Sequence, residues 1–137
     1  METLTGQLTE QGATLVGYAD LSSAPEGVRQ GFPRAVAMGV ALDPGVIAQV
    51  RAGPTPEYLA EYTRTNGPLD RLAERAASIL EGAGFQATPL TATGGISMAT
   101  LSAPFQHKTS ARLAGLGWIG KCALLINPDC GAAVRWN

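Results

Sequence analysis

The sequence predicts a single α/β domain, of the α+β kind, in which one mixed sheet is flanked by helices. Its length of 137 residues suits one domain, and 45% hydrophobic with 15% charged residues is a globular composition. Apolar runs typical of strands alternate along the chain with segments of helical period. Such alternation is typical of a sheet packed against helices, and we expect residues 1–137 to form one unit.

The N-terminal part of the chain supplies two strands of the predicted sheet. Residues 2–12 are expected to form a short helix that ends at Gly12, a residue suited to a left-handed stop. The stretch 13–21 is rich in residues that fit a pleated surface, which predicts the first strand. After a loop rich in Gly and Pro, the apolar run 35–42 predicts a central strand buried on both faces.

The longest helical signal covers residues 55–81, where apolar side chains fall mostly on one stripe of 3.6-residue period. Gly67-Pro68 is expected to kink this helix or divide it in two. Four shorter elements complete the prediction: a strand at 85–90, a helix at 108–116, and a hairpin formed by strands at 122–127 and 132–136.

Composition and charge exclude several classes of protein. A formal net charge of −1 gives no basic field strong enough to hold nucleic acid without help. No apolar run approaches the roughly twenty residues that span a bilayer, and the N-terminus lacks the pattern of a secretory signal. Cys122 and Cys130 are too few for a disulfide framework. We therefore expect a cytoplasmic protein that does not bind a membrane.

The stretch GLGWIG contains three glycines, Gly115, Gly117 and Gly120, in a pattern reminiscent of dinucleotide-binding loops. Those loops leave a strand and open a helix, whereas this one follows a predicted helix and precedes a strand. One interpretation is a helix C-cap beside a core tryptophan, Trp118. The other is a turn whose backbone and Lys121 contact a flat ligand, so that Gly117→Val should block binding and leave the core intact.

His107 is the single histidine of the chain and the weak candidate for a catalytic residue. Lys108 and Arg112 follow it, and such neighbours would lower its pKa and favour a neutral imidazole that accepts a proton. The plainer interpretation is a surface or hydrogen-bonded histidine. The preceding segment 91–105, which includes Ser102, is free of charge and is either a packed loop or the wall of a pocket for a large neutral ligand.

The segment HKTSARLAGLGWIGKCALLINPDCGAAVRW, residues 107–136, resembles a stretch of the epoxyqueuosine reductases and their iron–sulfur relatives. The helix predicted upstream also looks like that family's, and the similarity covers roughly residues 30–137. The resemblance implies a corrinoid-binding domain related to the flavin nitroreductases, with cobalamin held near Gly115, Gly117, Trp118, Gly120, Lys121 and Ser102. It also implies oxidoreductase chemistry in tRNA queuosine biosynthesis, with electrons from two [4Fe–4S] clusters in a further domain.

Two features of the sequence depart from that family. Leu101 stands where the tRNA-acting members have an aspartate proposed as proton donor, and His107 is the nearest titratable replacement. The chain also ends at Asn137, before any cluster ligands, which predicts a truncated N-terminal domain. [4Fe–4S] clusters and contact with tRNA are then expected only in a longer parent, and the unfinished last strand is expected to favour dimers.

The same departures leave a second hypothesis open, a non-catalytic module that binds a corrinoid, a flavin or a partner protein. FMN is the alternative cofactor, since the related nitroreductase architecture uses it. Its phosphate would need arginine or a helix N-terminus, and Arg34, Arg51 and Arg112 are available.

Overall fold

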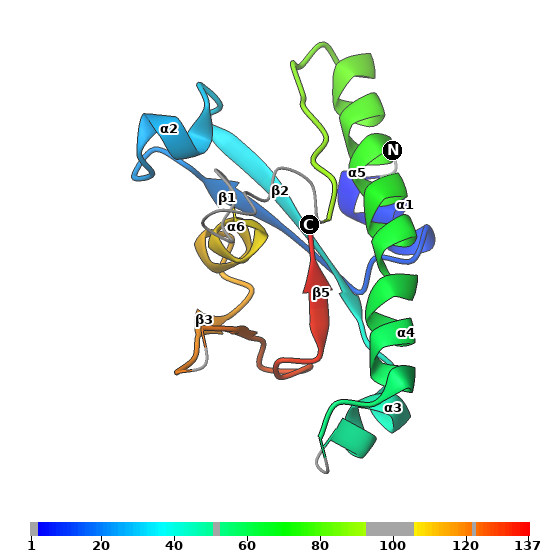
Figure 1. Ribbon diagram of the computed structural model, residues 1–137. Coiled ribbons are helices and arrows are strands. Elements are labelled where there is room, and N and C mark those ends of the chain that lie inside the picture. Colours follow the sequence, from blue (N-terminus) through cyan, green and yellow to red (C-terminus); the bar gives the residue numbers. More distant parts are fainter. Residues whose placement is uncertain (1–2, 51–52, 93–105, 122) are drawn as a thin grey trace.

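The structure is a computed structural model, and it describes residues 3–50, 53–92, 106–121 and 123–137. In the described residues, helices and strands alternate only as far as the second strand; a run of helices follows, and short strands end the chain (Figure 1). In order, the elements are α1 (Leu4–Glu10), β1 (Leu15–Asp20), α2 (Glu26–Arg29), β2 (Arg34–Ala41), α3 (Pro44–Gln49), α4 (Pro56–Arg64), α5 (Asn66–Gly82), α6 (His107–Leu113), β3 (Trp118–Ile119), β4 (Leu125–Ile126) and β5 (Val134–Trp136).

The main sheet has three strands in the order β1-β2-β5, and both pairings are antiparallel. The α+β class is therefore confirmed, whereas the predicted mixed sheet is wrong. β2 is the central strand, and Ala37, Met38, Gly39 and Val40 are buried on its two faces, as the apolar run predicted. The antiparallel pairing of β1 and β2 arises because α2 and its flanking turns return the chain directly beside β1.

The predicted hairpin of 122–127 and 132–136 is wrong. β4 pairs with β3 in a separate two-stranded sheet, and β5 pairs with β2 instead. The side chain of Asn127 explains the change of direction, because its Oδ1 accepts the backbone N–H groups of Asp129 and Cys130 and closes a tight turn. One isolated bridge, Asn127 to Gly131, is all that joins the two arms of that turn.

The strand predicted at 85–90 is also wrong, because this segment has no strand structure and is largely exposed. Pro89 has no N–H to donate to a neighbouring strand. A side chain holds the segment instead: Asn137 donates a hydrogen bond from Nδ2 to the carbonyl oxygen of Leu90 at 2.8 Å. The segment therefore runs beside the sheet without joining it.

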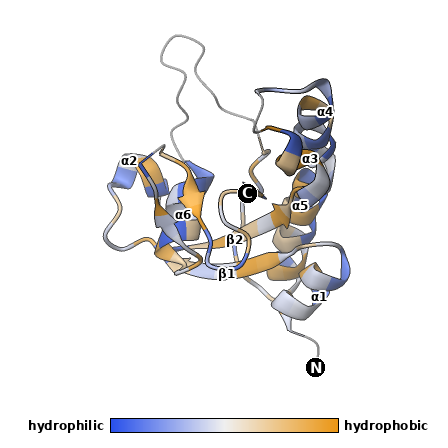
Figure 2. Cartoon of the chain, turned by 90° about the horizontal axis from the view of Figure 1, so that it is seen from below, coloured by the Kyte–Doolittle hydropathy of each residue, from blue (hydrophilic) through white to orange (hydrophobic). Residues whose placement is uncertain are grey.

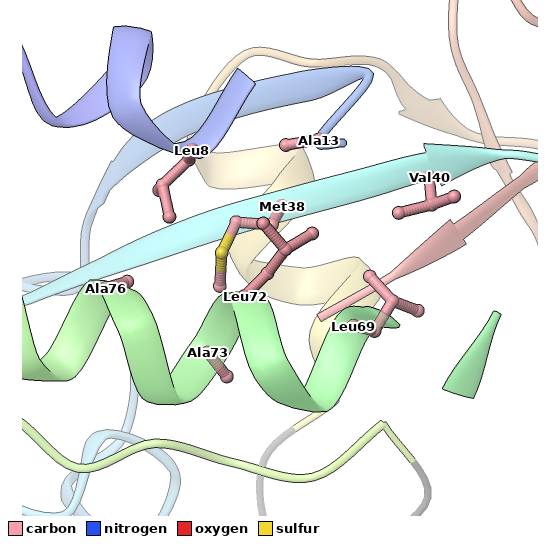
Figure 3. Packing of buried hydrophobic residues seen from close by; sticks show 8 residues of the cluster. All are labelled: Leu8, Ala13, Met38, Val40, Leu69, Leu72, Ala73 and Ala76. Atoms are coloured by element: carbon pink, nitrogen blue, oxygen red, sulfur yellow. The ribbon is translucent and has the colours of Figure 1, made fainter. Parts of the chain in front are cut away.

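The main hydrophobic core lies between the sheet and helices α1 and α5. Apolar side chains of α5 pack against Met38 and Val40 of β2, and Leu8 closes the cluster from α1 (Figure 3). The helical stripe predicted for 55–81 supplies this face. The expected division of this helix is confirmed, and it falls at Thr65. The division precedes Pro68 because the proline ring clashes with the carbonyl of Arg64, four residues earlier.

The opposite face of the sheet is covered by α6. Ala111 of α6 packs with Ala37 of β2 and Leu125 of β4 in a second, smaller cluster. Figure 2 shows the strands between α1 and α5 on one side and α6 on the other. Among the described residues, no helix is long and apolar enough to cross a membrane. The sheet is therefore covered by α1 and α5 on one face and by α6 on the other.

Candidate functional site

A cavity of about 600 Å³ lies between the strands of the main sheet, α5 and the region of α2. Its lining residues come in part from α2, the start of β2 and the chain that leaves α5, segments whose positions Figure 1 shows. Apolar side chains of β2 and α5 form much of its wall: Val36, Met38, Ala73, Ala76, Ala77 and Leu80. This volume falls within the range of sites that bind drug-sized ligands.

Exposed apolar side chains mark the mouth of this cavity. Tyr18, Phe85 and Leu90 line it, and they are 53%, 65% and 39% exposed. Tyr18 is fixed by a hydrogen bond of 2.7 Å between its hydroxyl and that of Thr5. Contiguous apolar surface around a hollow is a feature of ligand-binding sites, because it removes an apolar ligand from water.

His107 begins α6 and lines the cavity. Its Nε2 lies 3.0 Å from the carbonyl oxygen of Thr91, so Nε2 carries the proton and donates it, and Nδ1 is the acceptor of the neutral ring. Burial lowers the pKa of His107, although the Thr91 carbonyl and the Asp70 carboxylate act in the opposite direction. The predicted lowering is confirmed, but its cause is burial rather than Lys108 and Arg112.

Three consecutive residues, of which Leu90 lines the cavity, are held by side chains from three distant parts of the chain. Asn137 donates to the carbonyl of Leu90, and His107 donates to that of Thr91. The carboxylate of Asp70, on α5, accepts the N–H of Ala92 at 2.7 Å. Sequence reasoning missed Asp70 and Asn137, because each is distant in sequence from the segment it holds and no motif marks it.

The glycine turn has a structural explanation. Gly115 has φ +77°, and the Leu116 N–H bonds to the Ala111 carbonyl at 3.0 Å, which is a Schellman cap for α6. Gly117 lies against the backbone of β4, and a Cβ there would approach the carbonyl carbon of Ile126 to 2.8 Å. The helix cap is confirmed. The expectation that Gly117→Val would leave the core intact is wrong.

The remaining predicted site residues lie at the other end of α6 from His107. Trp118 is 54% exposed, so it is not a core residue, and Ile119 and Leu124 are exposed beside it on the β3–β4 hairpin. Lys121 is exposed in the turn of that hairpin. None of these four lines the cavity that His107 borders. Ser102 lies outside the described residues.

Metal-ligating side chains do not gather in the part of the chain that the structure describes. There, no three His, Cys, Asp or Glu residues lie close enough to hold an ion. Cys130 carries a free thiol, and Cys122 is outside the described residues. No protein-family model, curated protein or solved structure matches this chain.

We expect the buried imidazole to make folding stability depend on pH. The folded-state pKa of His107 lies below its ordinary 6.5, so the unfolded chain binds the proton more readily. Stability should therefore be complete above 6.5 and decline as pH falls below it, as urea unfolding at pH 7.5 and 5.5 would show. His107→Gln keeps an N–H donor for Thr91 without titrating, so its stability should change less over this interval.

The carboxylate of Glu61 titrates in a pH interval separate from that of His107. Arg64 and the N–H of Asp43 hold the pKa of Glu61 at about 2, so its contribution is lost only as pH falls below its ordinary 4.5. The His107 measurement is thus free of it. Equal slopes for wild type and His107→Gln between pH 7.5 and 5.5 would contradict the expected role of His107.

Proposed function

We propose that this chain binds a large planar cofactor, as the cofactor domain of an iron–sulfur-assisted reductase resembling epoxyqueuosine reductase. The observation that carries the proposal is the cavity of about 600 Å³, with its apolar walls and exposed apolar rim. The sequence resemblance of residues 107–136 suggests the class of cofactor. A [4Fe–4S] domain, electron transfer and tRNA are features of the family that the chain resembles, and this proposal assigns none of them to residues 1–137.

Two cofactors are candidates, and the cavity suits them differently. FMN is of the size that such a volume accepts, and Arg34 lies on the cavity wall where it could meet a phosphate. Cobalamin is much larger, so only part of it could enter, with its remainder over the exposed rim of Tyr18 and Phe85. Bound cobalamin would supply a reducing cobalt centre, and bound FMN would supply a hydride.

The position of His107 favours a binding role for this chain over a proton-donating one. Its Nε2 is engaged by Thr91, and its lowered pKa favours the neutral ring at pH 7. A neutral imidazole whose Nδ1 has no partner among the described residues can accept a proton or a hydrogen bond from a ligand. The alternative function, a non-catalytic module that binds a corrinoid, a flavin or a partner, follows from the same geometry.

Absorbance titrations with hydroxocobalamin and with FMN test the proposal. Ala77 is 7% exposed and lines the cavity, so Ala77→Phe should fill it and weaken binding by about tenfold or more. Ala60→Phe is the matched control, since Ala60 is exposed on α4 and does not line the cavity. Thermal unfolding of both variants shows whether the added ring disturbs the fold.

Trp118→Ala separates the cavity from the hairpin as the place of contact. If the cofactor binds at the cavity, this change should leave affinity unaltered, because Trp118 does not line it. If the indole stacks on the cofactor, affinity should fall while Ala77→Phe has no effect. Absence of binding by both cofactors to the wild-type chain would contradict the proposed function.

A further inference from the structure

The charged side chains of the cavity are distributed unevenly. Arg29 at the end of α2 and Arg34 at the start of β2 line it near one end of the strand pair, whereas the neutral imidazole of His107 lines it from α6. None of the described lining residues is Asp or Glu. A cavity whose described lining is largely apolar, with two arginines and neither Asp nor Glu, is complementary to a ligand that carries negative charge.

Arg34 has hydrogen-bonding capacity to spare. Within the described residues it forms no hydrogen bond through its side chain and no ion pair. Asp20 lies opposite Arg34 in the β1–β2 register, but its carboxylate accepts the N–H of Ser22 at 2.9 Å. The charge of Arg34 contributes only a minor part of the lowering of the Asp20 pKa.

Arg29 provides a second cation on the cavity wall, and its neighbour in α2 is Glu26. Its Nε lies 2.8 Å from Oε2 of Glu26, one turn earlier in α2. Glu26 is 65% exposed and is not part of the cavity wall, whereas the Arg29 side chain is only 33% exposed. The Arg29 side chain is therefore partly buried at the cavity wall, while the Glu26 carboxylate faces solvent and forms only a weak, exposed ion pair with it.

We propose that Arg34 and Arg29 form an anion subsite at the α2 end of the cavity, which binds a phosphate or carboxylate whose apolar or planar body occupies the rest. A guanidinium fork matches either group with two parallel hydrogen bonds. This inference rests on the proposed function and sharpens it, because it selects the phosphorylated member of each pair of related cofactors. Among flavins the ligand is FMN rather than riboflavin, and among corrinoids it is cobalamin rather than cobinamide, which lacks the nucleotide with its phosphate, so the flavin pair isolates the phosphate and Arg34→Gln isolates it in the corrinoid pair.

The test compares affinities within each pair. Flavin fluorescence would give dissociation constants for FMN and riboflavin, and absorbance would give those for hydroxocobalamin and cobinamide. The phosphorylated member should bind about tenfold more tightly or better to wild-type protein, and less so as salt is raised. Arg34→Gln should remove most of that preference and leave the affinity for riboflavin or cobinamide unchanged.

Arg71→Gln is the matched control, since Arg71 is exposed on α5 and does not line the cavity. It should preserve the preference, and the thermal stability of Arg34→Gln should match wild type because the side chain is exposed. Equal binding of both members of a pair, or a preference that survives Arg34→Gln, would overturn the anion subsite and leave the proposed function standing. Failure of all four compounds to bind would overturn both.

Discussion

Gly117→Ala is expected to destabilise the folded chain by about 1–3 kcal/mol through overpacking alone. A Cβ at this position would lie 2.8 Å from the carbonyl carbon of Ile126 and 3.3 Å from Cα of Asn127. These are backbone atoms of β4 and of the residue that follows it, so no side-chain rotation relieves the clash. The hairpin must instead move from α6, which would also disturb the 2.7 Å hydrogen bond from Asn127 Nδ2 to the Leu116 carbonyl. Urea unfolding measures the loss.

Two other glycines serve as controls for this measurement. Gly115 has φ +77° with no atom within 4 Å of a built Cβ, so Gly115→Ala should cost about 1 kcal/mol from backbone strain alone. Gly27 in α2 also has open space, and Gly27→Ala should be neutral or slightly stabilising. If Gly117→Ala costs no more than Gly115→Ala, the close approach of the two backbones does not constrain this residue.

The parts of the fold that could be predicted from the sequence are those in which local pattern and tertiary structure agree. The uninterrupted apolar run 35–42 predicted a central strand, and β2 lies between β1 and β5 with helices over both of its faces. Gly12 was expected to end the first helix, and it does so with φ +106°. The amphipathic stripe of 55–81 likewise identified the helical face that packs on β2.

The errors arose where pairing depends on residues far apart in the chain. The two C-terminal strands looked like a hairpin, because a turn separates them. In the structure β5 instead pairs with β2 and forms an edge of the main sheet. The pattern at 85–90 resembled a strand, but the segment is held by Asn137 and runs beside the sheet. Periodicity shows which face of a segment is apolar, and it does not show which partner covers that face.

The candidate site likewise has features that the sequence predicted and features that it did not. His107 was named from its chemistry, and the structure places it on the cavity wall. The cavity itself could not be predicted, because its walls come from segments that share no motif and meet only in the fold. The glycine turn was conspicuous in the sequence, yet Gly115 and Gly117 are explained by a helix cap and a close backbone approach. Contact of Trp118 and Lys121 with a cofactor stays a prediction.

Arg135 is a buried cation without an acidic partner among the described residues. It is 7% exposed on β5, beside Val40 of β2. Its Nη2 donates to Oδ1 of Asn66 at 2.6 Å, and the centre of its guanidinium lies 3.5 Å from the ring centroid of Tyr62. Burial lowers the pKa of Arg135, but a guanidinium stays charged at any ordinary pH. The ring and the amide therefore compensate for the solvent that the cation loses.

Arg135→Ala is expected to cost about 2–4 kcal/mol, because it leaves a void between β5 and α4 and removes the hydrogen bond to Asn66. Arg135→Met retains most of the apolar stem and removes the burden of a desolvated charge, so it should remain within about 1 kcal/mol of wild type. A double-mutant cycle with Tyr62→Leu isolates the stacking, for which we expect a coupling of about 0.5–2 kcal/mol. Urea unfolding supplies the free energies for the four proteins of the cycle (wild type, Arg135→Met, Tyr62→Leu and their double mutant) and for Arg135→Ala. A coupling near zero would mean that stacking on Tyr62 does not stabilise the fold. An Arg135→Met variant as unstable as Arg135→Ala would mean that the charge, and not the apolar stem, carries the contribution of Arg135.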